Sequence, residues 1–436
     1  MTTPHALQST SDGRRTAIYT ETFAAESQNT YRAMRRRHPS FADVELGPGV
    51  PATLVIGYET AVQVLNDADH FPADPRRWQA DLPAGSPMLS ALGWRPNALR
   101  NEGSDHRRFR SAGGDALAAV DLHAMHTLVE DIAISLINEF CALGAAELIG
   151  QYVYPLVCTA IDTMLGIEPD IGEQLVAGTT GSLNSVPDPE AAEKTMTAAL
   201  QDQVRRKRAD PGDDIISRLL GHPAGLTDEE LIEQVATLYG ASVEPLVHLI
   251  ANALLLLVTD EPFSGGLHDG SLSTRDALDR VLFNNPPLAN YCARYPRQPM
   301  LIEGIWLPAD EPVLVSIAAC NDDPKVRGGD RSGNRSHLAF GAGRHRCPAQ
   351  SAAYRIAQDA VDQLLDAVPD AELQVRPGEL HWRPGAFHRS LVALPVAFPP
   401  APPMNPGPSA AFRSRRIDVD FGGFDRGPQA HPGFET

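Results

Sequence analysis

The segment from Phe340 to Pro348, with the sequence FGAGRHRCP, places one cysteine between a glycine-containing turn and the start of an expected helix. Gly341 and Gly343 allow the backbone to adopt positive φ and to approach a bound group closely. Pro348 suits the first turn of a helix, where its missing N–H is not needed. We therefore expect Cys347 at a helix N-terminus, where the helix dipole and neighbouring arginines favour the thiolate.

A thiolate in this setting indicates a metal site, and a soft anionic axial ligand suits haem iron. Two other interpretations remain open. A glycine-rich turn into a helix also occurs without any chemistry. Zinc could take His345 together with Cys347, but zinc sites use paired ligand spacings. The remaining cysteines are scattered singly, at Cys141, Cys158, Cys292 and Cys320, which argues against zinc.

The composition limits the class of protein. The chain has 436 residues, of which 43% are hydrophobic and 21% charged, enough for one large enzyme fold or two ordinary domains. Five cysteines without close spacing, and no apolar N-terminal segment, favour a reduced, cytoplasmic protein. No run reaches the roughly 18 apolar residues of a membrane span. The net charge of −18 argues against nucleic-acid and anionic-lipid partners.

Apolar periodicity predicts mainly helices with a small β region. The capping box that begins at Thr227 starts a pattern continuing to about Val258, a helix roughly 45 Å long that must be central. Further helices are expected at 22–38, 115–142, 149–166, 274–283 and after Cys347, a strand pair at 52–66, and a long loop at 68–100. We expect a flexible N-terminus at 1–20, one domain at 21–398, and a disordered tail rich in proline and glycine at 399–436.

Several motifs agree on a family. Over nearly all of residues 20–398 the chain resembles a bacterial cytochrome P450 of the actinobacterial type. The family's haem-binding loop, Phe-Gly-x-Gly-x-His-x-Cys, matches at Phe340, Gly341, Gly343, His345 and Cys347. The family's His-x-x-x-Arg pattern matches at His106 and Arg110.

The resemblance implies a triangular-prism fold that encloses haem b between the long helix and the helix after Cys347. Cys347 would be the proximal iron ligand, and the haem propionates would be held by His106, Arg110, Arg294 and His345. It also implies a monooxygenase that acts on a small apolar substrate. Because the chain has no flavin or nicotinamide fingerprint, electrons would come from a separate ferredoxin or flavodoxin. A monomer is the default expectation.

The first departure from the family lies in the long helix, where members usually carry an acid followed by a threonine. Here the acid is Glu244 and the threonine position holds Pro245. Proline removes the hydrogen bond to the carbonyl of Ala241 and favours a kink, so the oxygen-binding groove can form without the hydroxyl that relays protons. We expect Glu244 to deliver protons, with Ala241 and Ser242 lining the groove.

The second departure lies in the helix at 274–283. The family's Glu-x-x-Arg pair falls on Arg280 and Phe283, with Asp279 one place early. Loss of both partners is often neutral, whereas loss of one partner leaves a buried charge. We expect this chain to belong with the few family members that lack both the threonine and this pair. Three alternatives to ordinary turnover therefore stay open: a haem-binding regulatory protein, a peroxide-driven oxidase and a haem-free relic.

Overall fold

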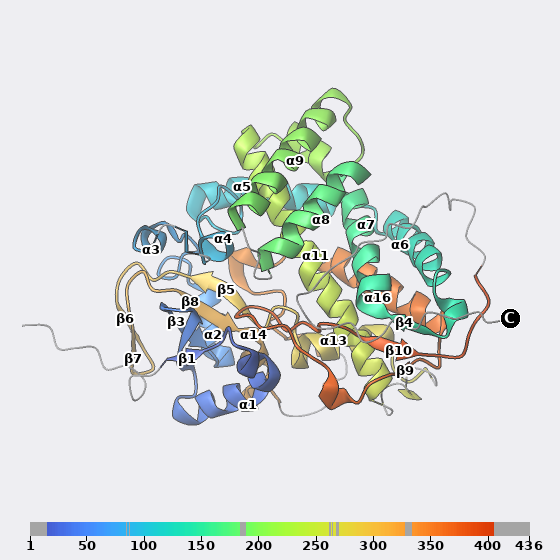
Figure 1. The fold of residues 1–436 in the computed structure, drawn as a ribbon. Coiled ribbons are helices and arrows are strands. Elements are labelled where there is room, and N and C mark those ends of the chain that lie inside the picture. Colours follow the sequence, from blue (N-terminus) through green and yellow to red (C-terminus); the bar gives the residue numbers. More distant parts are fainter. Residues whose placement is uncertain are drawn as a thin grey trace, which may run out of the picture.

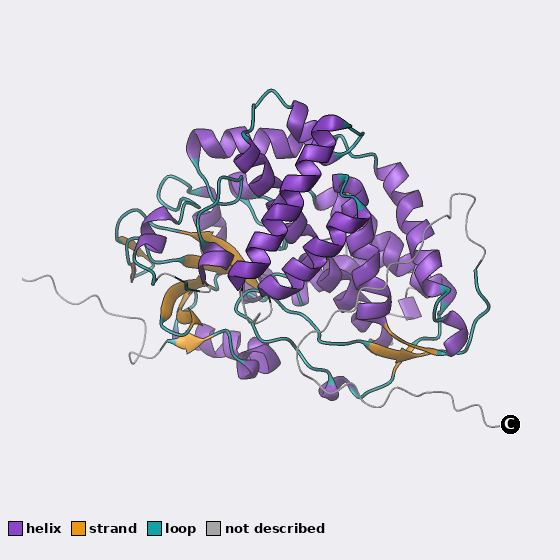
Figure 2. Cartoon of the chain, turned by 45° about the horizontal axis from the view of Figure 1, so that its top comes forward, coloured by secondary structure: helices purple, strands orange, loops and turns teal. Residues whose placement is uncertain are grey.

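The computed structural model describes residues 15–404 except 84, 87, 184–188, 261, 262, 264, 267–269 and 328–333. Figure 1 shows a broadly triangular body of helices with a sheet at one side. In Figure 2 the helices fill most of the molecule and the strands are confined to two places at its edge. The mainly helical class with a small β region, predicted from the sequence, is confirmed.

Polar side chains cap some of the helices: Thr20, Asp121 and Thr227 each accept a hydrogen bond from a backbone N–H of the helix that they precede. The helices are α1 (Glu21–Arg37), α2 (Tyr58–Asn66), α3 (Arg76–Ala80), α4 (Met88–Leu92), α5 (Gly103–Ala118), α6 (Leu122–Ile137), α7 (Tyr154–Leu165), α8 (Pro169–Leu183), α9 (Pro189–Ala209), α10 (Ile215–Gly221), α11 (Asp228–Thr259), α13 (Thr274–Asn284), α14 (Ile317–Asn321), α15 (Pro324–Arg327) and α16 (Gln350–Ala367). Single turns of other helix types lie at η1 (Cys141–Leu143), η2 (Ile149–Val153), η3 (Gly343–His345) and η4 (Pro377–Glu379).

The longest helix, α11, crosses the body as expected. Its capping box is complete: the Thr227 side chain accepts a hydrogen bond from the Glu230 N–H at 3.3 Å, and the Glu230 carboxylate accepts one from the Thr227 N–H at 2.9 Å. Helices α7, α13 and α16 pack against it. By length and composition α11 could span a membrane, yet 67% of its most apolar 18-residue window is buried inside the protein, as is typical of a core helix.

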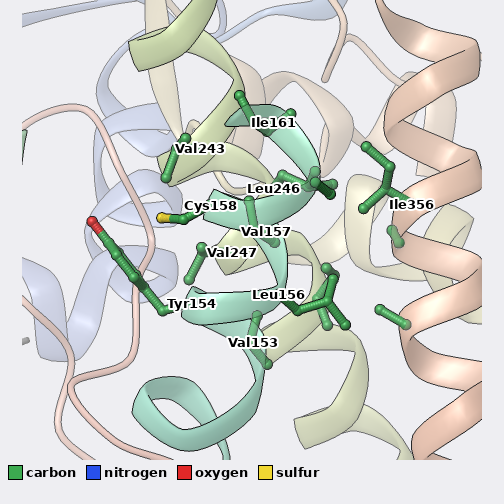
Figure 3. Close-up of a cluster of buried hydrophobic side chains, with 14 of the residues drawn as sticks. Val153, Tyr154, Leu156, Val157, Cys158, Ile161, Val243, Leu246, Val247 and Ile356 are labelled. Carbon is green, nitrogen blue, oxygen red and sulfur yellow. The ribbon is translucent and has the colours of Figure 1, made fainter. Parts of the chain in front are cut away.

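The main core lies where α7 meets α11 and α16. Figure 3 shows Leu156 and Val157 of α7 among Leu246 and Val247 of α11 and Ile356 of α16. Each of these side chains is at most 4% exposed. Burying one such aliphatic side chain contributes roughly 1.5–3 kcal/mol to folding. The contact therefore fixes the position of α11 relative to the helix that follows Cys347.

In the described part of the chain the strands form three small sheets. The five-stranded sheet has the order β1-β2-β3-β8-β5, from β1 (Thr16–Ala17), β2 (Phe41–Gly47), β3 (Val50–Val55), β8 (Val313–Ser316) and β5 (Asn290–Arg294). The second sheet has the order β4-β10-β9, from β4 (Ala145–Glu147), β10 (Pro395–Ala397) and β9 (Glu372–Leu373). A hairpin joins β6 (Met300–Ile302) to β7 (Ile305–Leu307).

Three expectations differ from the structure. The predicted strand pair at 52–66 is wrong in its second half, which is α2, because Ala61, Val64 and Leu65 bury one helical face. The single helix predicted at 115–142 is instead the end of α5 and all of α6, separated where Asp121 caps α6 by accepting two backbone N–H bonds. The loop at 68–100 contains the short helices α3 and α4.

The ends of the chain are described only in part. Within the expected tail, the backbone N–H of Ala401 donates to Cys141 O at 2.9 Å, and that of Met404 donates to Asn138 Oδ1 at 2.7 Å. At the other end, Thr16 and Ala17 pair with β2. The remainder of both expected flexible ends, 1–14 and 405–436, lies outside the described residues.

Candidate active site

The loop around Cys347 is a tight hairpin that leads into α16. The Cys347 N–H donates to the Phe340 carbonyl at 2.8 Å, and the Gly341 N–H donates to Leu338 O at 2.8 Å. Gly343 has φ +68°, and a Cβ there would lie 2.3 Å from the carbonyl oxygen of Leu65 on α2. The glycine is therefore required for the loop to rest against α2.

The electrostatics of Cys347 only partly follow the sequence argument. Burial raises the pKa of its thiol, while the Ala349 N–H and the charges of Arg110 and Arg346 act in the opposite direction. Contrary to expectation, burial outweighs the helix terminus and the arginines. The thiolate of the isolated chain is thus disfavoured, and a cation bound to the sulfur would restore it.

Two histidines expected to hold carboxylates lie together beside the loop. The rings of His106 on α5 and His345 have centroids 4.1 Å apart. Burial, followed by the nearby charge of His345, lowers the pKa of His106 to about 4, so its imidazole is neutral near pH 7. His106 Nε2 is buried without a hydrogen-bond partner among the described residues.

Arginines complete this group. Arg294, at the end of β5, is 3% exposed, and its Nε has no hydrogen-bond partner in the described part of the chain. Its charge acts on both Glu102 and His345. Arg110 donates to the carbonyl oxygen of Arg346, directly before Cys347. The structure thus brings together all five ionisable side chains that the resemblance assigned to the cofactor: His106, Arg110, Arg294, His345 and Cys347.

Glu102 is a member of this group that sequence reasoning missed. Its Oε1 lies 2.7 Å from His345 Nε2, and it also accepts the Ala73 N–H at 3.0 Å. Burial raises the pKa of Glu102, but the His345 hydrogen bond and nearby charges outweigh it, so the net shift is downward. The acid directly precedes α5, a position with no recognisable signal in a single sequence.

The middle of α11 is less buried than the half of the helix that follows it. Gly240 and Ala241 are exposed, and Ser242 and Pro245 are half-buried. A Cβ added to Gly240 would meet no atom within 4 Å. These residues are therefore not fully covered by other side chains of the described chain. This stretch contains the residues expected to form the oxygen groove.

Glu244 points into a buried polar cluster. It accepts hydrogen bonds from His248 Nε2 at 2.8 Å and from Arg383 at 3.2 Å. Burial alone would raise the pKa of Glu244, but these two partners and His388 outweigh it and lower the pKa to about 2. The second carboxylate oxygen, Oε1, has no partner among the described residues. His248 and Arg383 were not singled out from the sequence, although His248 lies one helical turn after Glu244.

The donor set fits haem rather than zinc. Buried, unsatisfied nitrogens on His106 and Arg294 suit the carboxylates of haem propionates, because an ionised acceptor forms strong hydrogen bonds. Among the described residues, no group of three or more His, Cys, Asp or Glu side chains is arranged to hold a metal ion. A single thiolate suits an iron whose other ligands come from a porphyrin.

Comparison with known proteins supports this interpretation. No protein-family model matches the chain. The cytochrome P450 monooxygenase PikC of Streptomyces venezuelae is 30% identical over 389 residues, which cover 86% of this chain and 91% of PikC. The 6-deoxyerythronolide B hydroxylase of Saccharopolyspora erythraea is 27% identical over 401 residues, 87% of this chain and 98% of the hydroxylase.

Solved structures show the same fold. The testosterone-bound CYP154C4 from a Streptomyces species superimposes with a TM-score of 0.82 at 24% identity, covering 89% of this chain and 99% of that protein. CYP154A1 from Streptomyces coelicolor gives a TM-score of 0.80 at 24% identity, covering 88% and 100%.

Proposed function

The chain belongs to the cytochrome P450 family, and we propose that it inserts one oxygen atom from O2 into a small apolar organic substrate. It is a haem-dependent monooxygenase, as its relatives are. The main support for the proposal is that Cys347 lies in a loop beside two buried nitrogens, His106 Nε2 and Arg294 Nε, that have no hydrogen-bond partner among the described residues. A thiolate-ligated haem supplies activation of dioxygen, with the thiolate favouring O–O cleavage.

Each proposed cofactor residue has a separate role. Cys347 would bind the iron as a thiolate. His106, Arg110, Arg294 and His345 would hold the two propionates, and Phe340 and Gly341 would shape the loop that carries Cys347. Glu102 keeps His345 oriented through their 2.7 Å contact. Since Arg294 is buried, its pairing with a propionate would be little screened by solvent.

Ala241 and Ser242 of α11 would line the oxygen groove, and Pro245 lies inside the same helix, one turn after Ala241. Glu244 is ionised near pH 7 because its pKa is about 2, so it cannot store a proton as a neutral acid. We propose that its partner-free Oε1 accepts a hydrogen bond from a water molecule and orients that water for proton delivery, while His248 and Arg383 hold the carboxylate in place. Ser242 is the nearest hydroxyl in sequence to replace the missing threonine.

Electrons would come from a separate ferredoxin or flavodoxin. Arg107, Arg344 and Arg346 are exposed around the cysteine loop and α5, where they suit an acidic partner surface. Arg108, next to Arg107 on α5, pairs with Glu230 on α11 and contributes less to this surface. We further propose a cytoplasmic monomer that binds neither membrane nor nucleic acid.

The substrate pocket would be closed by residues 88–99 and by the 171–200 region, of which 184–188 lie outside the described residues. One relative is named a 2-hydroxy-5-methyl-1-naphthoate 7-hydroxylase and another a 6-deoxyerythronolide B hydroxylase. Both names are those of enzymes that hydroxylate an organic molecule. They support an organic substrate for this chain without selecting one.

A second candidate is supported by Pro245 and by the restrained Glu244. We propose that this chain belongs to a subset without the threonine and the Glu-x-x-Arg pair, in which peroxide drives turnover or the haem serves a regulatory role. An assay of the purified protein with a ferredoxin system and with hydrogen peroxide separates these functions. Turnover with reductase supports the monooxygenase, turnover with peroxide alone supports the second candidate, and no turnover with either supports a regulatory role.

A further inference from the structure

The two positions where the family carries a buried Glu-x-x-Arg pair do not form one in this chain. Arg280 has a side chain that is 48% exposed and pairs with Asp260 at 3.1 Å. Phe283 is buried and packs edge-on against His337, with ring centroids 5.3 Å apart and an interplanar angle of 90°. Arg280 is therefore not a buried charge without a partner, which is what the alignment of α13 with the family's Glu-x-x-Arg helix requires.

A buried carboxylate is nevertheless present one position earlier. Asp279 is 5% exposed and accepts a hydrogen bond from Arg335 Nε at 3.1 Å. Its other oxygen accepts the hydroxyl proton of Tyr354. Arg335 precedes the cysteine loop, and Tyr354 lies on α16, directly after it. One carboxylate on α13 therefore ties together the two segments that flank Cys347.

Aromatic contacts connect Tyr354 and His337 to Phe340, the first residue of the cysteine loop. The Phe340 ring packs against Tyr354 at 5.6 Å and against His337 at 5.9 Å. Because Tyr354 gives its proton to Asp279, its oxygen can accept from His337 Nε2, which lies 3.3 Å away. The Phe340 carbonyl in turn accepts the Cys347 N–H at 2.8 Å.

A cation–π contact also holds the Tyr354 ring. The guanidinium of Arg275, at the start of α13, lies 4.0 Å from the centre of the Tyr354 ring. Burial, followed by the hydrogen bond to Asp279, raises the pKa of Tyr354, so the phenol remains a donor at every physiological pH. Donor and acceptor roles in the network are therefore fixed.

We propose that Asp279 is a positioning residue that replaces the missing Glu-x-x-Arg pair. Through its contacts with Arg335 and Tyr354, and through the packing of Tyr354 on Phe340, it holds the cysteine loop in the conformation that binds haem. The inference requires the haem loop but not the proposed substrate or electron donor. It also explains why the pair at Arg280 and Phe283 could be lost, because a buried acid still anchors the loop.

The test compares D279N with the matched control R280Q, which changes the adjacent, exposed residue of the same helix. Backbone amide exchange is measured on the full chain, both haem-free and haem-loaded, for the peptide that contains Phe340 to Cys347. Losing a charge-assisted hydrogen bond should raise local opening of the loop roughly ten- to hundredfold. In the same samples a peptide from α6 should exchange as in the unmodified protein, which distinguishes a local effect from global loss of stability.

The second readout is the spectrum of the reduced, carbon-monoxide-bound protein. D279N should show a several-fold smaller thiolate-type Soret band per bound haem, and R280Q an unchanged one. If D279N matches R280Q in both loop exchange and spectrum, the proposal is wrong. If D279N does not fold, Y354F decides by the same two criteria, since it removes one hydroxyl and keeps the ring. Exchange in the haem-free chain does not depend on catalysis, so this result stands apart from the proposed function.

Discussion

Glu244 accepts a hydrogen bond at 2.8 Å from Nε2 of His248, one turn farther along α11. The two side chains are 7% and 2% exposed, so solvent screens their interaction little. The acid that the family places beside its threonine is therefore restrained and ionised in this chain. Its contribution to proton transfer can be measured separately from haem binding.

Removing this charge should affect one mode of turnover more than the other. E244Q should lower reductase-driven turnover by about a hundredfold, because positioned proton-transfer groups contribute on that order. Peroxide brings its own protons, so peroxide-driven turnover should change much less. The control is E229Q, the same change in the exposed first turn of α11. Equal loss in both modes would contradict a proton-transfer role for Glu244.

Restoring the family's threonine tests the significance of Pro245. P245T should increase product formed per electron consumed in the reductase assay, because it adds a hydroxyl next to the oxygen groove. P245A provides the control: both variants remove the proline, which costs up to about 3 kcal/mol in a helix interior, and both should melt at higher temperature. If P245A improves the product yield as much as P245T, the effect comes from removing the proline and not from adding the hydroxyl.

Arg294 should affect haem binding and folding in opposite directions. R294Q removes a buried charge that is proposed to hold a propionate, so haem affinity should fall roughly ten- to hundredfold. The haem-free protein should be as stable as the unmodified chain or more stable, because an uncompensated buried charge is costly. Haem titration and thermal melting of the haem-free form measure the two effects, with R77Q on exposed α3 as control. A destabilised haem-free form with normal haem affinity would contradict the assignment.

Buried neutral histidines make the fold sensitive to acid. Burial, followed by the charge of Arg383, lowers the pKa of His388 to about 3, below the ordinary value of 6.5. The unfolded chain therefore binds a proton below pH 6.5 that the folded chain does not, and stability falls as pH drops from 6.5 toward 3. At pH 5 the loss from His388 is about 2 kcal/mol. H388N should reduce the decrease in melting temperature between pH 7.5 and 5, whereas H123N at an exposed site should not. An unchanged pH profile for H388N would show that His388 does not titrate as described.

Sequence reasoning located the cysteine loop and the central helix because both carry local signals. The loop has glycines at fixed spacing before Cys347, and α11 has a capping box at Thr227 followed by a continuous apolar face. The pattern at 58–66 was misread as a strand because Val62, Val64 and Leu65 suit both structures, and only Gly57 marks the start of the helix.

Contacts between distant segments could not be predicted in this way. Glu102 and His345 are separated by 243 positions, and Asp279 and Tyr354 by 75. Each residue alone looks like an ordinary polar side chain on a helix or beside one. The sequence shows Asp279 one position before the family's glutamate but does not reveal its partner. That partner, Arg335, lies in an irregular segment with no periodic pattern. Such pairs become visible only once the helices are packed.

The account depends on Cys347 binding haem iron as a thiolate, and the reduced, carbon-monoxide-bound absorbance spectrum of the purified full chain tests this most directly. We predict the red-shifted Soret band of thiolate ligation in the unmodified protein and its loss in C347A. A protein that binds no haem, or a C347A variant that keeps the red-shifted band, would contradict the central claim.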